Sequence, residues 1–438
     1  MIQLLTRLLA ALDEGGQPIA GHLDALQQWL PTAWAACHGE QLLMEAVLDA
    51  ASTMLAVARC PRRSNPGPHP RPHPRPDPNP DPERDPDPGP NQARPAPLPL
   101  LLASLQLVDA ATQPDGAGGM LHAAGGLMEV ALRLWKSALA SLHPALRAEP
   151  ALAAGFGGLA ARLPLVLELG DELLRPSMFV LDWCALQDAH LLACGGRFAA
   201  AHGGMMAALL EGALARNPER RGALAAIGLM HTLLICAPAD SAEALGPPLA
   251  ACARTLTHAL TGEGANELLL AAMAGVLGRA LLSAPSLFEA ALAACHTADA
   301  LPRLATAWLQ LGDSILLSAH RKLAAVALGQ MLGLDAAMLP LAPEVLSFAV
   351  SVLAEQAPRD EPDSPPRRCE SARFAHEHAE FAAALEASGL DPVRGLELRA
   401  TLQQCVARAA AAHGAAFGAA MQALDPDLMA QVQAAFGS

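Results

Sequence analysis

The clearest metal-like pattern in this chain is a short run of histidine and glutamate at a spacing of two. His376, His378 and Glu380 form the pattern HxHxE. Imidazole and carboxylate groups bind zinc, but the HExxH spacing of a helical zinc site is absent here. The run also stands at the edge of a polar loop. We therefore interpret these residues as solvated surface and predict no metal site.

A second group brings two thiols and an imidazole into one short stretch. Cys184, His190 and Cys194 could approach one another on a helical hairpin. A thiol beside an imidazole is the arrangement that activates a nucleophile. We interpret the three as core and near-core residues, because a free cysteine in an apolar helix behaves as a small hydrophobic side chain.

Other candidate patterns are weaker still. The glycine pairs at 118–119, 125–126 and 203–204 lack the spacing and the preceding strand of a phosphate-binding loop. Asp171–Glu172 suit the first turn of a helix, where the helix dipole favours acids. Arg321–Lys322 could bind an acidic partner, but we interpret the pair as a solvated helix start. We predict no catalytic residue, no cofactor and no enzyme activity.

The elements that carry these residues should be helices. Two consecutive sets of apolar residues in the stretch 304–334 fall at helical spacing: Leu304, Trp308, Leu311 and Ile315, then Leu323, Ala327 and Met331. Such a hairpin cannot bury its apolar faces alone, and similar units recur along most of the chain. The pattern predicts an all-α solenoid of stacked helical hairpins.

Composition supports the all-α class. Hydrophobic residues make up 52% of the 438 residues, yet aromatic residues are only 3% and tyrosine is absent. Alanine and leucine, the strongest helix formers, dominate, whereas β-branched residues that favour strands are scarce.

The charge is strongly negative. The chain carries −14, and residues 59–98 hold seven arginines against five acids, so the rest of the chain carries −16. An acidic surface repels nucleic acid and anionic membrane and suits basic protein partners. Ordinary solubility would explain the same charge.

Nine cysteines without a CxxC pair indicate a reducing cytosolic or nuclear compartment.

Residues 222–239 contain no charge, but they include His231 and Pro238 and are flanked by Arg220, Arg221 and Asp240. We expect a buried helix there and no membrane insertion.

Proline marks the main internal boundary. Sixteen of the 37 prolines lie between Pro61 and Pro99. Proline at every second position forbids helix and sheet interior, so we expect an extended loop there. The resulting domain prediction is helices in 1–58, a disordered Pro-rich insertion in 59–98, a repeat array in 99–356, a polar acidic and Pro-containing loop with a short helix in 357–390, and C-terminal helices in 391–438.

Within the array, proline and glycine predict where helices end. We expect breaks at Gln113–Gly119, Pro144, Pro164, Asn217–Pro218, Gly246–Pro248, Thr261–Ala265, Pro285 and Pro302. In the last helix, Asp425 should cap the N-terminus, Pro426 should fit the first turn, and Leu428, Val432 and Phe436 should face inward.

Several segments, in order, resemble the C-terminal part of the importin-β (karyopherin-β) family, and specifically its importin-eleven type. The resemblance covers nearly the whole chain apart from the two polar loops. Its segments are residues 26–58 (LQQWLPTAWAACHGE…), 98–114 (LPLLLASLQLVDAATQP), 127–135 (LMEVALRLW), 273–292 (MAGVLGRALLSAPSLFEAAL), 308–332 (WLQLGDSILLSAHRKLAAVALGQML) and 391–437 (DPVRGLELRATLQQC…).

The resemblance implies a superhelix of HEAT repeats and the transport of proteins through nuclear pores under control of the GTPase Ran. It implies a basic cargo protein bound on the inner helices, contacts with nuclear pore proteins, and a location in cytoplasm, nucleus and nuclear envelope. Family members are about twice as long, and the N-terminal repeats that contact Ran have no counterpart here. We therefore expect Met1 to fall within a longer array. No cargo or Ran contact residue can be transferred.

An alternative leaves Ran aside. A helical-repeat scaffold could recruit SH3-like or WW-like partners through the proline loop, since such domains bind extended proline-rich segments.

Overall fold

The computed structural model describes residues 20–37, 40–59, 96–113, 126–142, 149–160, 162, 190–191, 196–216, 220–259, 266–315, 318–356 and 390–436. These described residues form helices and turns and contain no strand. The predicted all-α class is therefore confirmed. The chain divides into two compact units, Met1–Arg175 and Pro176–Ser438.

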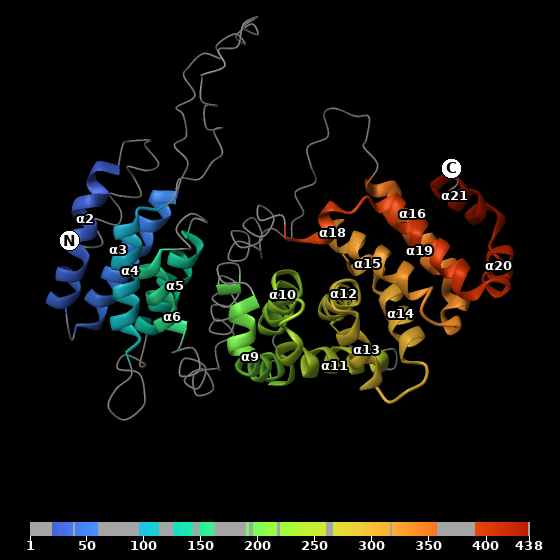
Figure 1. The fold of residues 1–438 in the computed structure, drawn as a ribbon, viewed down its shortest axis with the longest axis horizontal. Helices are drawn as coiled ribbons and strands as arrows, with labels where there is room; N and C mark the ends of the chain where they lie inside the picture. Colours follow the sequence, from blue (N-terminus) through green and yellow to red (C-terminus); the bar gives the residue numbers. More distant parts are fainter. Residues whose placement is uncertain are drawn as a thin grey trace, which may run out of the picture. The chain divides into compact units, whose positions relative to one another are not determined.

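The first unit stacks its helices in two layers. α2, α4 and α6 pack side by side in one layer, and α3 and α5 pack side by side in the other. Figure 1 shows these helices in blue to teal. Their bounds are α2 (Ala20–Ala36), α3 (Gln41–Arg59), α4 (Leu98–Ala111), α5 (Gly126–Ala140) and α6 (Pro150–Ala160).

Both apolar burial and side-chain hydrogen bonds join the helices of this unit. Trp135 of α5 is fully buried, while the hydroxyls of Ser52 and Ser137 lie 3.1 Å apart where α3 meets α5. Arg162, just after α6, donates to the carboxylate of Asp109 and to the hydroxyl of Thr112 at the end of α4. These bonds join helices that neighbour one another within one layer.

The second unit continues the same design with more helices. One row contains α9, α11, α13 and α14, continued by α16, and the other contains α10, α12, α15 and α19. In the view of Figure 1, α10, α12 and α15 lie above α11, α13 and α14. The bounds are α9 (Gly196–Arg216), α10 (Arg220–Cys236), α11 (Ala242–Ala259), α12 (Glu267–Ser283), α13 (Pro285–Ala293), α14 (Ala300–Gln310), α15 (Ser318–Met331), α16 (Ala342–Gln356) and α19 (Leu398–His413).

The hairpin expected in residues 304–334 is present. α14 and α15 form it, with the short 3-10 helix η2 (Gly312–Ser314) in the turn. All seven apolar residues that define its two faces are buried. The helical period therefore located a true core face, although Leu311 and Ile315 lie just beyond the end of α14.

One expected break is wrong. Gly246–Pro248 lies inside α11, which runs without interruption from Ala242 to Ala259. The two prolines leave the carbonyls of Glu243 and Ala244 without their helical donors. Leu245 and Leu249 are fully buried. We attribute the continuous helix to this packing, which outweighs the local preference of proline.

The C-terminal part follows the expected pattern in more detail. α18 (Pro392–Gly395) begins directly after Asp391, and Gly414, with a φ of 52°, separates α19 from α20 (Ala415–Gln422). The last helix, α21 (Pro426–Phe436), starts at the predicted proline. The carboxylate of Asp425 accepts the backbone N–H of Asp427, as expected for a cap. Val432 is buried, and Leu428 and Phe436 pack against the same core.

Two predicted regions lie outside the described residues. They are most of the Pro-rich insertion in 59–98 and nearly all of the loop in 357–390. The domain boundaries that we derive from composition remain a prediction.

Candidate functional site

A buried ion pair of the second unit lies where the C-terminal segment meets the α10–α12–α15 row. Arg279 of α12 donates from Nη1 to Asp391 Oδ1 at 2.8 Å and from Nη2 to Oδ2 at 3.1 Å. The two side chains are only 6% and 10% exposed. We call the group of His231, Arg279, His320, Lys322 and Asp391 the polar junction. Its central ion pair is bidentate, the strongest geometry for arginine and carboxylate.

Two histidines extend the junction across the row. Arg279 Nε donates to Nδ1 of His231 at 3.1 Å, so this nitrogen of the half-buried ring must be unprotonated. Burial lowers the pKa of His231 well below 6.5, and the charges of Arg279 and His320 lower it further. His231 stacks on His320 of α15 with the ring centres 5.9 Å apart. A neutral His231 is therefore part of the folded arrangement.

Lys322 fixes the other end of the returning segment. Its Nζ donates to the carbonyls of Arg394 at 3.0 Å and Leu396 at 2.6 Å. Asp391 meanwhile caps α18 by accepting the backbone N–H of Val393 at 3.0 Å. The segment 391–396 is thus held at both ends by side chains of α12 and α15.

Arg321–Lys322 stand at a helix start, as the sequence predicted, but the two cations bind neighbouring elements rather than solvent alone. Besides the lysine contacts, Arg321 donates to Glu355 at 2.8 Å and to the carbonyl of Gly312 at 2.9 Å. Its guanidinium also lies 5.2 Å from the ring centre of Phe348. The pair stands in the first turn of α15, between η2, α16 and α18, so neighbouring elements supply acceptors for both cations.

The polar junction holds residues 391–396 against the α10–α12–α15 row and does not resemble a catalytic centre. Arg279 is paired with Asp391, Lys322 is held by two backbone carbonyls, and none of the five side chains carries a hydroxyl or thiol that could act as a nucleophile. Sequence reasoning missed Arg279 and Asp391 as a pair. The available signal was the single cation in the apolar run ELLLAAMAGVLGRALLS, because a cation inside a buried helix requires a partner.

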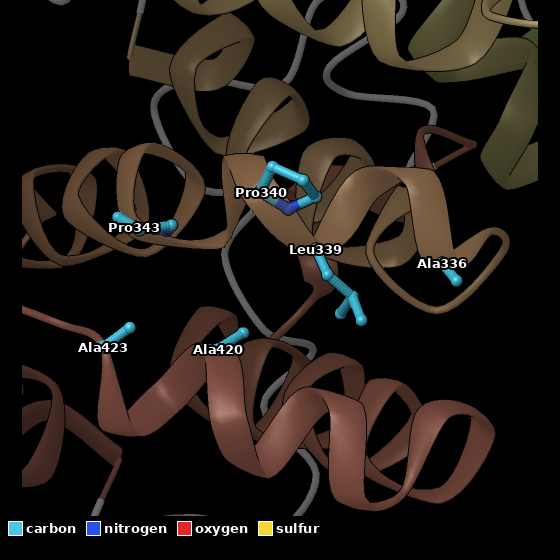
Figure 2. Close-up of a pocket in the computed structure, with 6 residues that line it drawn as sticks. All are labelled: Ala336, Leu339, Pro340, Pro343, Ala420 and Ala423. Atoms are coloured by element: carbon cyan, nitrogen blue, oxygen red, sulfur yellow. The ribbon is translucent and has the colours of Figure 1, made fainter.

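A second feature of this unit is an apolar hollow of about 390 Å³. It lies between the 3-10 helix η3 (Ala336–Leu341) with the start of α16 on one side and α20 on the other. In Figure 2 the side chain of Leu339 points toward α20, and Ala420 and Ala423 point back. We call it the C-terminal hollow; its lining residues are Ala336, Leu339, Pro340, Pro343, Ala420 and Ala423.

Few of the candidate residues from the sequence can be placed. The metal-like residues His376, His378 and Glu380 lie outside the described residues, as do Asp171–Glu172, Cys184, Cys194, the glycine pair 118–119 and Gly125, whereas Gly126 is the first residue of α5. Within the part that the structure describes, no group of three or more His, Cys, Asp or Glu side chains could hold a metal ion. Gly203 and Gly204 lie in α9, where a Cβ atom would come within 3.3 Å and 2.9 Å of Glu243. They allow close packing of α11 on α9.

Described cysteines behave as core residues. Cys37, Cys252, Cys295 and Cys405 are buried, and Cys236 is half-buried. Burial raises the pKa of Cys252 to about 12 and also raises the pKa of Cys405. Thiols with raised pKa values stay protonated and are poor nucleophiles.

Of Cys184, His190 and Cys194, only His190 lies among the described residues. It is buried against the ring of Phe198, with the ring centres 4.8 Å apart. Burial, with a smaller effect of the charge on His202, lowers the pKa of His190 to about 3. Its environment is that of a core residue, as the sequence predicted.

The low pKa of His190 predicts acid sensitivity of the second unit. Between pH 6.5 and about 3 the unfolded chain binds a proton at this residue that the folded chain does not, so stability falls as pH falls, by up to about 1.4 kcal/mol per pH unit. Urea midpoints of wild type and His190→Phe, measured from pH 7 to pH 4, should show a shallower slope for the variant.

The control for this experiment is His258→Gln, which removes an exposed histidine of α11. A slope that changes equally in both variants, or in neither, would exclude His190 as the source of the acid sensitivity.

One described stretch, Ala336–Gln356, is long and apolar enough to cross a membrane by length and composition alone. It consists of η3 and α16 and contains two prolines. Val345, Leu346, Ala349 and Val352 of α16 are buried, and three of them belong to core clusters shared with α15, α19 or α21. The uncharged run that begins at Gly222 forms a shorter apolar helix, α10, which packs against α9 and α12.

Comparison with known proteins gives a family match and a solved structure of similar fold. The model of the importin-11-like family, TPR repeats, matches residues 103–437. Among solved structures, Lph2 of S. cerevisiae, described as a bidirectional nuclear transport receptor, matches with a TM-score of 0.66 and 13% identity over 99% of this chain.

The alignment covers only 43% of the Lph2 chain, so this chain spans less than half the length of that structure. No curated protein matches the chain significantly. The family model extends over about three quarters of the chain and describes as TPR repeats the hairpins that we expected to be HEAT-like. The chain therefore belongs to the importin-11-like family.

Proposed function

We propose that this chain forms the C-terminal portion of a nuclear transport receptor and binds a cargo protein for Ran-dependent import into the nucleus. The observation that carries the proposal is the family match over residues 103–437. The two-row stack of helical hairpins supports it, because such arrays present extended surfaces to protein partners. The polar junction and the C-terminal hollow also agree with a non-enzymatic carrier, because they offer contact surfaces and no nucleophile.

The partners follow from charge and length. Outside residues 59–98 the chain carries −16, which favours a basic cargo. Because the chain spans 43% of Lph2, we propose that Ran binds mainly through repeats that precede it in the whole receptor. Contacts with nuclear pore proteins and movement between cytoplasm and nucleus complete the proposal.

The test uses the receptor as it exists in its source cells. A tag at the C-terminus allows its bound proteins to be identified, with and without excess Ran loaded with a non-hydrolysable GTP analogue. We expect at least one basic protein to be released by Ran-GTP and to lose its nuclear accumulation when the gene is deleted. Nuclear accumulation that is unchanged for every bound protein would contradict the proposal.

A second function has one specific observation in its favour, the sixteen prolines between Pro61 and Pro99. A Ran-independent scaffold would recruit SH3-like or WW-like domains through this stretch. Deletion of residues 61–99 separates the two functions. It should abolish binding to such domains if the scaffold function holds, and it should leave Ran-sensitive cargo binding intact if the receptor function holds.

A further inference from the structure

The C-terminal hollow differs from the polar junction because nothing charged lies among its lining residues. Leu339 is nearly buried, Pro343 and Ala420 are half-buried, and Ala336, Pro340 and Ala423 are exposed. Its volume of about 390 Å³ falls at the lower end of the range for ligand pockets. The hollow therefore has room for a large apolar side chain and offers that side chain only aliphatic contacts.

Three exposed acidic residues are next to, or two residues from, lining residues at the two ends of this hollow. Asp335 directly precedes Ala336 and caps η3 by accepting the backbone N–H of Ala337 at 2.9 Å. Glu344 directly follows Pro343, and Asp425 lies two residues after Ala423. All three side chains are exposed. In Figure 2, Ala336 lies at one end of the hollow, and Pro343 and Ala423 lie at the other.

No positive side chain compensates these acids within the segments that build the hollow. Residues 323–356 and 414–436 contain no lysine, arginine or histidine. This differs from the polar junction, where Arg279 and Lys322 satisfy the acid and the carbonyls that approach them. Among the described residues none of the three carboxylates forms an ion pair, although Asp335 and Asp425 each accept a backbone N–H.

We propose that the C-terminal hollow binds a basic protein segment that carries one large apolar residue between lysines or arginines. The apolar residue fills the space between Leu339 and Ala420, and the flanking cations face Asp335 at one end and Glu344 and Asp425 at the other. The inference rests on the proposed function, since it assigns to a cargo or adaptor a contact at the C-terminal end of the array. The complementary charge selects this occupant over an acidic or neutral one.

The test measures binding of a labelled peptide, one leucine flanked by two lysines on each side, to the full chain by fluorescence anisotropy. The variant Asp335→Asn/Glu344→Gln/Asp425→Asn keeps side chains of the same shape, and asparagine caps a helix as well as aspartate does. We expect it to bind about tenfold more weakly, because each exposed ion pair contributes a few-fold. The control Glu211→Gln/Glu289→Gln/Asp313→Asn removes three exposed acids from other elements and should bind as wild type.

A second pair of variants tests the hollow itself. Ala420→Phe fills it from α20 and should abolish binding, whereas Ala434→Phe adds the same ring at an exposed position of α21 and should not. A peptide with alanine in place of leucine should bind more weakly to wild type. The proposal is overturned if both triple variants lose affinity equally, since the attraction would then come from net charge alone.

Other occupants would give different results, and each would overturn the proposal. If deletion of residues 60–95 strengthens peptide binding, the chain's own basic proline segment occupies the hollow. If the chain dimerises and Ala420→Phe makes it monomeric, a second copy does. Failure here is distinguishable from failure of the transport function, because Ran-sensitive cargo release and nuclear accumulation can persist in the Asp335→Asn/Glu344→Gln/Asp425→Asn variant.

Discussion

Replacement of Asp391 by alanine should destabilise the second unit by about 3–5 kcal/mol, one of the two largest effects that we expect from a single substitution. The change leaves the guanidinium of Arg279, only 6% exposed, without its carboxylate. It also removes the cap of α18, since Asp391 accepts the N–H of Val393. An unpaired buried cation loses hydration that nothing replaces.

Urea unfolding of the purified chain gives the size of this effect, and hydrogen exchange gives its location. Amides of α18 and α19 should exchange faster in Asp391→Ala, because Arg279 and Lys322 hold residues 391–396 on the α10–α12–α15 row. The matched control is Asp299→Ala. Asp299 pairs with Arg303 on the exposed face of α14, so its loss should leave the urea midpoint unchanged.

A double variant distinguishes the ion pair from the rest of the junction. Arg279→Met/Asp391→Leu removes both charges together and should be more stable than Asp391→Ala alone, because no unpaired ion remains buried. Its recovery should be incomplete, since His231 Nδ1 then loses the donor Nε of Arg279. If Asp391→Ala is as mild as Asp299→Ala, the pair is hydrated and does not hold the C-terminal helices.

The helices themselves could be predicted because their signals are local. Apolar residues at helical spacing identified the buried faces of α14 and α15, and Pro285 and Pro426 stand at the first positions of α13 and α21 as expected. The error at Pro247 and Pro248 has the same origin. Local rules end a helix at proline, whereas the packing of Leu245 and Leu249 depends on a neighbouring helix.

The contacts between distant segments could not be predicted in this way. Arg279 and Asp391 are 112 residues apart, and the packing of α18 and α12 against α15 brings them together. The same holds for Arg321 and Lys322, whose acceptors come from η2, α16 and the residues around α18. A sequence shows that a lone cation in an apolar helix needs a partner, but the tertiary arrangement decides which residue that partner is.

The effect of a substitution at Gly278 also depends on a contact with a distant residue, Trp308. It is the second of the two largest effects that we expect. A Cβ atom built on Gly278 would lie 2.2 Å from Cη2 of Trp308 and 3.1 Å from the Cβ of Ala327. Trp308 is 1% exposed and cannot move aside into solvent. Gly278→Ala should therefore destabilise the second unit by about 1–3 kcal/mol or more, although alanine gains about 1 kcal/mol in helix propensity over glycine.

Gly275→Ala is the matched control, in the same helix and one turn earlier. The nearest atom to its added Cβ is Nε2 of His231 at 3.6 Å, an ordinary contact. The propensity gain should then appear alone, so this variant should be more stable than wild type by about 0.5–1 kcal/mol. Opposite signs for two identical substitutions in one helix would show that the fit of α12 against Trp308 decides the outcome.

A double-mutant cycle with Trp308→Phe tests that fit directly. The phenyl ring lacks the outer indole atoms that the new methyl group would meet, and Trp308 Nε1 makes no hydrogen bond to any described residue, so no polar partner is lost. Gly278→Ala/Trp308→Phe should be more stable than the sum of the single changes predicts, with a favourable coupling of about 1 kcal/mol or more. Additive effects would mean that α12 shifts as a whole to accept the methyl group, and glycine at 278 would then set the position of α12 rather than its contact with Trp308.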